Sequence, residues 1–120
     1  MGIIQYIMIA FVVIWLVLRF MPVKGVRQIS AAELKQELGE KNKQYIDVRT
    51  PGEYQGGHIR GFSNMPLHQL TESLSSLSKE KEVVVICQSG MRSQKACSLL
   101  RKHGFHQITN VRGGMSAWRG

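Results

Sequence analysis

The residues best suited to chemistry follow a run of four apolar residues, Val83 to Ile86, and begin with Cys87. A glycine three positions after the cysteine lets neighbouring backbone N–H groups turn inward and form an anion-binding nest. A helix that begins after the loop adds positive potential at its N-terminus, and an arginine five positions after the cysteine adds more. We therefore expect Cys87 to act as a thiolate nucleophile. The residues expected to bind an anionic substrate around it are Gln88, Ser89, Gly90, Met91 and Arg92.

Strand and helix patterns alternate from residue 26 onward. The expected strands are 26–29, 45–48, 83–86 and 108–111, the expected helices are 30–38, 67–77 and 93–103, and a final turn is expected at 115–118. This alternation predicts an α/β fold with a small, mostly parallel sheet and helices on both faces. Ligands of such sheets bind beyond the carboxyl ends of the strands. Cys87 follows the most apolar strand, so it would stand at that edge.

Two of these helices have specific sequence signals. Ser30 and Glu33 form a capping box, in which each side chain bonds the other residue's backbone N–H, and Gly39 offers a stop to this helix. In the second helix, leucines recur at positions 67, 70, 74 and 77, which is the spacing of one buried helix face.

Three separate motifs resemble those of the rhodanese family of sulfurtransferases. They are the Cys-x-x-Gly-x-Arg-Ser pattern at 87–93, the segment 47–67 and the segment 111–118, and together the similarity covers nearly all of residues 27–118. The resemblance implies a rhodanese-like fold and an enzyme that needs no metal or organic cofactor. It implies that Cys87 takes a sulfane sulfur from a small anionic donor, such as thiosulfate or a persulfide. The resulting persulfide passes the sulfur to a thiophilic acceptor, such as cyanide or another protein.

The sequence departs from common family forms at three places. Phe62 follows Gly61 where alanine is frequent, and the chain ends soon after Trp118. Gln88 and Ser89 are neutral where members that specialise in thiosulfate often carry a basic residue. The last departure argues against thiosulfate as the natural donor.

Two other functions stay open. A cysteine phosphatase or arsenate reductase also uses a thiolate in an anion cradle, but it places the arginine six positions after the cysteine, whereas Arg92 is five after Cys87. The shorter loop makes a pocket better sized for a sulfur atom than for a tetrahedral oxyanion. A membrane-tethered carrier or binding module with little free turnover would keep the same loop, so only an assay separates it from an enzyme.

Four further polar or sulfur-containing residues have structural interpretations that compete with functional ones. Asp47 and Arg49 could line the pocket, but a pair between Arg49 and Glu53 is the favoured interpretation. His58 is expected to fix loop backbone rather than act as a general base. Cys97 falls on the apolar side of a helix and is expected in the core, with a resolving role as the alternative.

The head of the chain differs from the rest. Residues 3–18 contain no charged side chain, and all eight acidic residues lie later in the sequence. We expect residues 1–21 to be a single transmembrane anchor that contacts lipid through residues 3–21, followed by a linker at 22–26 and the domain at 27–120. The positive-inside rule places the N-terminus outside and the domain in the cytoplasm. Pro22 is expected to end the helix.

The formal net charge of +8 calls for an anionic partner. The basic residues are spread along the chain without interleaved aromatics, which does not favour nucleic acid. Arg19, Lys24 and Arg27 stand beside the apolar segment, where anionic lipid headgroups would be natural neighbours. Two cysteines cannot make a dense disulfide scaffold, and a free reactive cysteine fits a reducing compartment.

Overall fold

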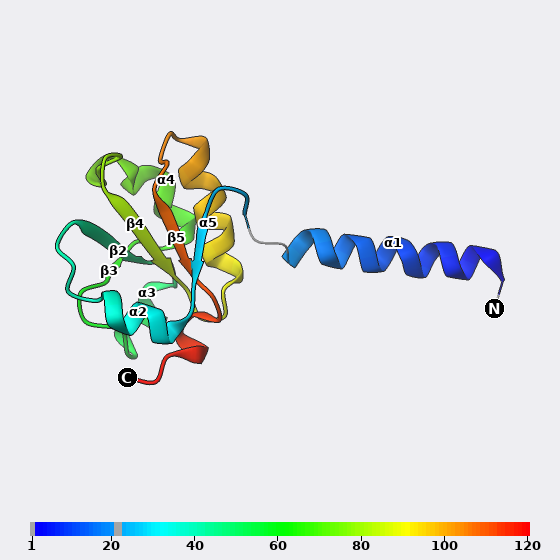
Figure 1. Ribbon diagram of the computed structural model, residues 1–120, viewed down its shortest axis with the longest axis horizontal. Helices are drawn as coiled ribbons and strands as arrows, with labels where there is room; N and C mark the ends of the chain where they lie inside the picture. Colours follow the sequence, from blue (N-terminus) through cyan, green and yellow to red (C-terminus); the bar gives the residue numbers. More distant parts are fainter. Residues whose placement is uncertain (1, 21–22) are drawn as a thin grey trace.

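The computed structural model describes residues 2–20 and 23–120, which form a long N-terminal helix and an α/β domain (Figure 1). The strands are β1 (Arg27–Ile29), β2 (Lys43–Asp47), β3 (Ser63–Asn64), β4 (Glu82–Ile86) and β5 (Ile108–Val111). The α-helices are α1 (Ile3–Phe20), α2 (Ala31–Glu37), α3 (Pro51–Gln55), α4 (Leu70–Ser73) and α5 (Met91–Lys102). Short 3-10 turns cover Leu67–Gln69, Leu74–Ser76 and Gly114–Ala117.

The five described strands form one sheet in the order β1-β5-β4-β2-β3. Every pairing between these described strands is parallel, which confirms the predicted parallel sheet. Strand β4 lies in the middle, between β5 and β2, so that Val85 stands beside Asn110 on one side and Ile46 on the other. The residue that follows β4 is therefore placed at the centre of the carboxyl edge of the sheet.

The apolar run in β4 is explained by burial on both faces. Val83 and Val85 pack in a cluster that contains Leu100 of α5, whereas Val84 and Ile86 pack in a second cluster with Leu34 of α2. Successive side chains of a strand point to opposite faces, so a strand covered on both sides needs an apolar residue at every position. The predicted helices on both faces of the sheet are confirmed.

The capping box of α2 is confirmed, and α3 begins with a second one. The Glu33 amide donates to the Ser30 hydroxyl at 3.1 Å, and the Glu33 carboxylate accepts from the Ser30 amide. Helix α2 ends just before Gly39, whose φ of +98° lies in the region that glycine adopts most readily. In α3 the same reciprocal bonds join Thr50 and Glu53, with a proline in the first turn. Both helix starts therefore follow from local side-chain chemistry.

The single helix predicted over 67–77 is wrong in detail. The segment is divided into the 3-10 turn Leu67–Gln69, helix α4 and the 3-10 turn Leu74–Ser76. Two serine hydroxyls donate to nearby carbonyls, Ser73 to Gln69 and Ser76 to Ser73, and such local bonds compete with regular helix. The leucine spacing still identified correctly which side of this segment faces the core. Leu70 is fully buried, and Leu67, Leu74 and Leu77 pack against the same cluster.

The predicted apolar N-terminal helix forms as α1, but the transmembrane anchor is not supported. Within the described ranges 2–20 and 23–120, no helix combines the length and the hydropathy that a membrane span requires. The 18 residues of α1 rise about 27 Å, less than a typical hydrocarbon core of about 30 Å. Side chains 3–18 are exposed. Pro22, the predicted helix terminator, lies outside the described residues.

Of the three cations predicted to face lipid headgroups, Arg27 has other partners. Its guanidinium pairs with Glu37 at 2.7 Å and with Glu82 at 2.9 Å, and Lys43 joins the same group of charges. Arg27, Lys43 and Glu82 lie at the amino ends of β1, β2 and β4, opposite the edge that carries Cys87, and Glu37 is the last residue of α2. Arg27 therefore helps to hold the strand ends together, and its predicted contact with lipid headgroups stays a prediction.

Candidate active site

Cys87 directly follows β4, and the loop after it is wrapped around its sulfur. The Gly90 amide donates to the Cys87 Sγ at 2.9 Å. Gly90 has a φ of +102° and precedes the first residue of α5, so its unusual backbone angle turns the chain from the strand into the helix. The Cys87 side chain is fully buried. One amide of the predicted nest therefore points at the sulfur, and the N-terminus of a 12-residue helix lies beside it.

Ser93, on the first turn of α5, completes the surroundings of the sulfur. The Cys87 thiol donates to the Ser93 hydroxyl over 3.5 Å, and that hydroxyl donates to the Gly90 carbonyl at 3.0 Å. Ser93 is fully buried. These bonds from the thiol to the hydroxyl and from the hydroxyl to the carbonyl hold the Cys87 side chain in place, and the hydroxyl can rotate to donate to the sulfur instead.

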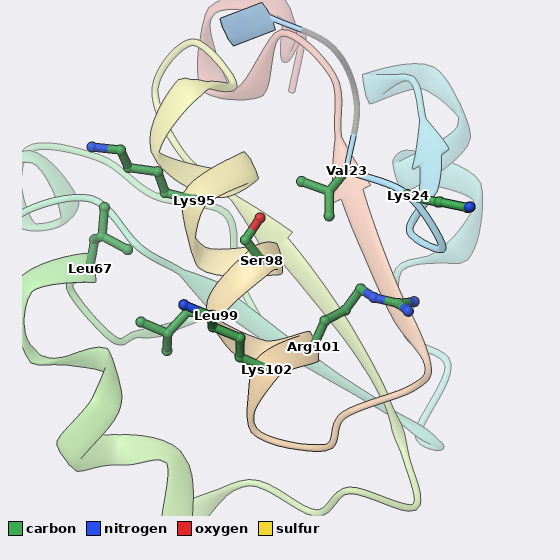
Figure 2. Close-up of a pocket in the computed structure, with 8 residues that line it drawn as sticks. All are labelled: Val23, Lys24, Leu67, Lys95, Ser98, Leu99, Arg101 and Lys102. Atoms are coloured by element: carbon green, nitrogen blue, oxygen red, sulfur yellow. The ribbon is translucent and has the colours of Figure 1, made fainter. Parts of the chain in front are cut away.

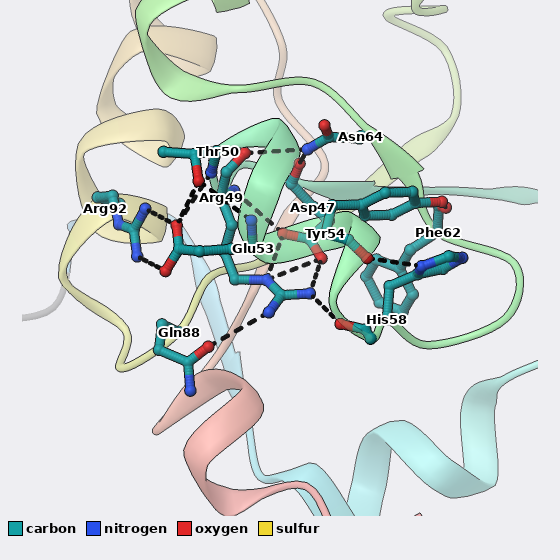
Figure 3. Close-up of polar contacts among 11 residues, drawn as sticks. Asp47, Arg49, Thr50, Glu53, Tyr54, His58, Phe62, Asn64, Gln88 and Arg92 are labelled. Atoms are coloured by element: carbon teal, nitrogen blue, oxygen red, sulfur yellow. Dashed lines mark hydrogen bonds and ion pairs between the residues drawn. The ribbon is translucent and has the colours of Figure 1, made fainter.

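Arg92 does not point at the sulfur as a free cation. Its guanidinium makes two bonds to the Glu53 carboxylate, from Nη1 to Oε1 at 2.6 Å and from Nη2 to Oε2 at 2.9 Å (Figure 3). The hydrogen bonds from Arg92 are the main reason that the pKa of Glu53 falls to about 2, and the Thr50 amide contributes as well. The pKa of Arg92 is raised by the same contact. Glu53 therefore neutralises the cation that was expected to bind the anionic substrate.

Arg49 is buried and pairs with Asp47, so the predicted pair of Arg49 with Glu53 is wrong. The Arg49 Nη2 lies 2.8 Å from the Asp47 Oδ2, and its Nε also donates to this carboxylate. The remaining nitrogen, Nη1, donates to the Gln88 side-chain oxygen at 3.2 Å, which joins this buried pair to the cysteine loop (Figure 3). The other expected substrate-binding residues, Ser89 and Met91, are exposed at the loop surface.

The C-terminal motif packs directly against the cysteine loop. The Met115 amide donates to the Cys87 carbonyl at 2.8 Å, and the Ser116 amide donates to the Gln88 carbonyl at 2.9 Å. The Ser116 hydroxyl makes a further bond to the same Gln88 carbonyl. All three sequence motifs that were singled out therefore meet at one place, with the thiol at its centre.

A family model described as a rhodanese-like domain matches residues 30–120. The chain belongs to this family. A protein from Allochromatium vinosum named sulfurtransferase is 35% identical over 94 residues, which cover 78% of this chain and 88% of that protein. The uncharacterized protein YqhL of Bacillus subtilis is 43% identical over 82 residues, 68% of this chain. The chain spans 65% of the length of YqhL.

Solved structures agree with this assignment. The crystal structure of a rhodanese-like domain protein from Staphylococcus aureus has a TM-score of 0.72 and 34% sequence identity. The similarity covers 78% of this chain and 92% of that one. The rhodanese-like fold is therefore shown, and the relatives named as sulfurtransferases support sulfur transfer as the general class of chemistry.

Elsewhere in the rhodanese-like domain, His58 supports loop structure, as predicted. Its Nδ1 lies 2.9 Å from the Tyr54 carbonyl, and its ring stacks on that of Tyr54 with centroids 3.7 Å apart. The Tyr54 hydroxyl in turn donates to the Phe62 carbonyl. The contacts of Tyr54 with His58 and with the Phe62 carbonyl hold the segment between α3 and β3 in place (Figure 3).

Cys97 is buried in the core on α5, as predicted. Burial is the main reason that its pKa rises to about 12, and the charge of Cys87 adds to the effect. A thiol with so high a pKa stays protonated near neutral pH and is a poor nucleophile. Among the described residues, no group of three or more His, Cys, Asp or Glu side chains is arranged to hold a metal ion.

Three residues at this site were not among the predicted site residues: Ser93, Glu53 and Ser116. Ser93 closes the family pattern that begins at Cys87, so the pattern itself could have pointed to it. Glu53 was predicted to form an ion pair with Arg49, whereas it pairs with Arg92. Ser116 lies in the motif 111–118, but nothing in that motif indicated that it contacts the cysteine loop, 28 residues earlier in the sequence.

Proposed function

We propose that Cys87 carries a transferred sulfur atom as a persulfide. In the first step the Cys87 thiolate attacks the outer sulfur of a donor, the donor's S–S bond breaks, and its remaining fragment leaves with the electron pair as a thiolate or sulfite. In the second step a thiophilic nucleophile attacks the outer sulfur of the persulfide and releases the Cys87 thiolate. Each step exchanges one bond to sulfur for another, so no cofactor is required.

The observation that carries this proposal is the 2.9 Å bond from the Gly90 amide to the Cys87 Sγ. An amide that already points at the sulfur stabilises negative charge there without reorganisation. The Ser93 hydroxyl, 3.5 Å away, supplies a second donor once it turns from the Gly90 carbonyl. The nearby N-terminus of α5 favours the same charge.

The charges around the loop favour a persulfide over thiosulfate as the donor. Arg92 is neutralised by Glu53, and Arg49 by Asp47. Gln88 and Ser89 add no charge. Thiosulfate is a dianion whose whole charge lies at the reacting group and needs an excess of positive charge there, whereas the reacting persulfide group of a persulfide donor bears at most one negative charge. The proposed donor is therefore a persulfide, with thiosulfate as a slower substrate.

The proposed acceptor is a thiol or another soft nucleophile, including a cysteine of a protein. Cys87 is fully buried in the described structure, so a bulky acceptor reaches the persulfide only after its surroundings open. A carrier that hands its sulfur to one protein partner would share this geometry. The proposal thus includes both an enzyme that serves small acceptors and a carrier that serves one protein partner. The two differ in their turnover with small acceptors.

We also propose that α1 contacts membrane lipid, with the domain on the cytoplasmic side. Supporting this, the side chains of residues 3–18 are exposed although nearly all are apolar. Exposure of so many apolar side chains to water would be strongly unfavourable. Cell fractionation followed by protease treatment of intact cells tests this placement, because a domain outside the cell would be digested.

The test of sulfur transfer is mass spectrometry of the full chain after incubation with glutathione persulfide or thiosulfate. We expect a gain of one sulfur atom on Cys87, lost again on adding cyanide. Cys87→Ser should gain none, while Cys97→Ala should load like wild type because Cys97 lies in the core. Absence of an adduct with every donor would leave only a binding function.

A further inference from the structure

A groove of about 780 Å³ lies along α5 (Figure 2), and none of residues 87–92 lines it. Its walls come from three parts of the chain: α5 itself, Leu67, and residues 23–24, where the domain begins. Val23, Leu67 and Leu99 give it an apolar floor. The sulfur-transfer chemistry at Cys87 uses none of these residues.

The rim of the groove is strongly basic. The cations that line it are Lys24, Lys95, Arg101 and Lys102. Among the described residues that line it, none is acidic. The ion pairs of the described part of the chain engage other cations, namely Arg27, Lys43, Arg49, Arg92 and Arg112. The groove therefore presents four positive charges that the protein's own carboxylates do not neutralise.

The cations do not converge on one point. In Figure 2, Lys95 and Lys24 project to opposite sides of the groove. Lys95 and Lys102 are exposed, whereas the Arg101 Nη1 donates to the Gly25 carbonyl at 3.2 Å and ties the start of the domain to α5. Spread charges of this kind suit an extended anionic surface better than a single phosphate group.

Chain connectivity places the groove close to α1. Helix α1 ends at Phe20 and Val23 lines the groove, so the two are three residues and at most about 11 Å apart. This distance is close to the Debye length of about 8 Å at physiological salt, over which a charged membrane surface is felt. If α1 contacts lipid as proposed above, the groove lies within the reach of lipid headgroups.

We propose that this groove binds the headgroups of anionic phospholipids at a membrane surface. The basic rim matches the charge of the phosphates, and the apolar floor accepts the upper part of an acyl chain. The inference rests on the proposed contact of α1 with lipid, but it adds a distinct property. Helix α1 would bind neutral and anionic bilayers alike, whereas the groove would give a preference for anionic ones and orient the domain.

The experiment measures binding of the full chain to vesicles of phosphatidylcholine alone and of phosphatidylcholine with 30% phosphatidylglycerol, a composition chosen as roughly that of an anionic leaflet. The test variant is Lys95→Glu/Lys102→Glu. The control is Lys35→Glu/Lys41→Glu, which makes the same charge change at exposed positions outside the groove. Sulfur loading of Cys87 verifies that every variant is folded.

We expect the groove variant to lose at least about tenfold in affinity for the anionic vesicles and nothing for the neutral ones, since each basic residue near such a surface contributes about 1 kcal/mol. The control should lose far less. Equal losses in the two variants would overturn the groove proposal. Binding to polyglutamate, a model of an acidic protein, is measured in parallel. If the groove variant binds both kinds of vesicle like wild type but loses binding to polyglutamate, the groove binds an acidic protein instead. A wild-type chain that binds neither vesicle would refute the lipid contact of α1.

Discussion

Gly114 lies against the Cys87 backbone so closely that a Cβ at position 114 would be 2.1 Å from the Cys87 carbonyl oxygen. Real Cβ atoms essentially never approach another atom below 3.0 Å. Gly114 also has a φ of +55°. The C-terminal motif therefore reaches the cysteine loop through a glycine because no side chain fits there.

Gly114→Ala should displace the loop that holds the sulfur. We expect sulfur loading to slow at least about tenfold and the protein to lose more than the roughly 1–2 kcal/mol that left-handed backbone costs a non-glycine residue. The matched control is Gly39→Ala, which also has a positive φ but meets nothing within 4 Å. This variant should lose only the stability that the left-handed backbone costs, and its Cys87 should take up sulfur at the wild-type rate. Loading assays with urea unfolding test both, and equal loading rates would contradict the prediction.

Glu53→Gln should shift donor preference toward thiosulfate. Glutamine keeps the capping box of α3, so the helix start survives while the negative charge beside Arg92 is lost. Because thiosulfate places two negative charges at the reacting group and a persulfide places only one there, thiosulfate gains more from the freed positive charge. Its kcat/KM should therefore rise roughly fivefold relative to that for glutathione persulfide, corresponding to about 1 kcal/mol.

The control for this change is Glu72→Gln, which removes the same negative charge at an exposed position on α4. It should leave the ratio of the two kcat/KM values unchanged. If Glu53→Gln also leaves that ratio unchanged, the pairing of Arg92 does not determine donor preference.

Ser93→Ala should slow the formation of the persulfide. The variant removes the hydroxyl that lies 3.5 Å from the Cys87 Sγ and leaves the buried backbone in place. Loss of one hydrogen bond to a charged group costs about 1.5–3 kcal/mol, so loading should fall about tenfold or more. Ser98→Ala, at an exposed position on the same helix, is the control. Stopped-flow loading that is equally fast in both variants would show that the hydroxyl serves only the fold.

Stability should fall in acid because of the charge group at the amino ends of the strands. The hydrogen bonds from Arg27 are the first cause that lowers the pKa of Glu37 from 4.5 to about 2. A lowered pKa in the folded state stabilises the protein above about pH 4.5, and this contribution is lost as the pH falls from there toward 2.

Glu37→Gln should therefore flatten the dependence of the urea midpoint on pH between 5 and 2. Glu72→Gln, at an exposed position on α4, should keep the wild-type slope. If the two variants show the same slope, the pair of Arg27 with Glu37 is not a source of acid sensitivity. Some slope should remain in Glu37→Gln, since the pKa of Glu53 is also about 2.

Local patterns predicted the features that depend on neighbouring residues. The capping box of Ser30 and Glu33 forms because its bonds span three residues. The apolar run at 83–86 identified a strand covered on both faces, and the glycine at position 90 identified the turn around the sulfur. Such features need no knowledge of the rest of the chain.

Predictions of which carboxylate pairs with which arginine were less accurate, because the partners can lie far apart in sequence. Glu53 lies four residues from Arg49 but pairs with Arg92, 39 residues away, whereas Arg49 pairs with Asp47. Arg49 has two carboxylates nearby in sequence, Asp47 and Glu53, so spacing could not decide which of them it pairs with. Burial decided instead, because a guanidinium enclosed at the end of β2 needs a buried carboxylate beside it.

The sequence by itself predicted the candidate nucleophile and where the elements that hold it begin, because thiol, glycine and helix caps act over a few residues. Only the tertiary structure decided the charge around that thiol and the groove beside α5. Both arise where segments far apart in sequence meet at one edge or one helix face, and the packing of the sheet, rather than any local pattern, brings those segments together.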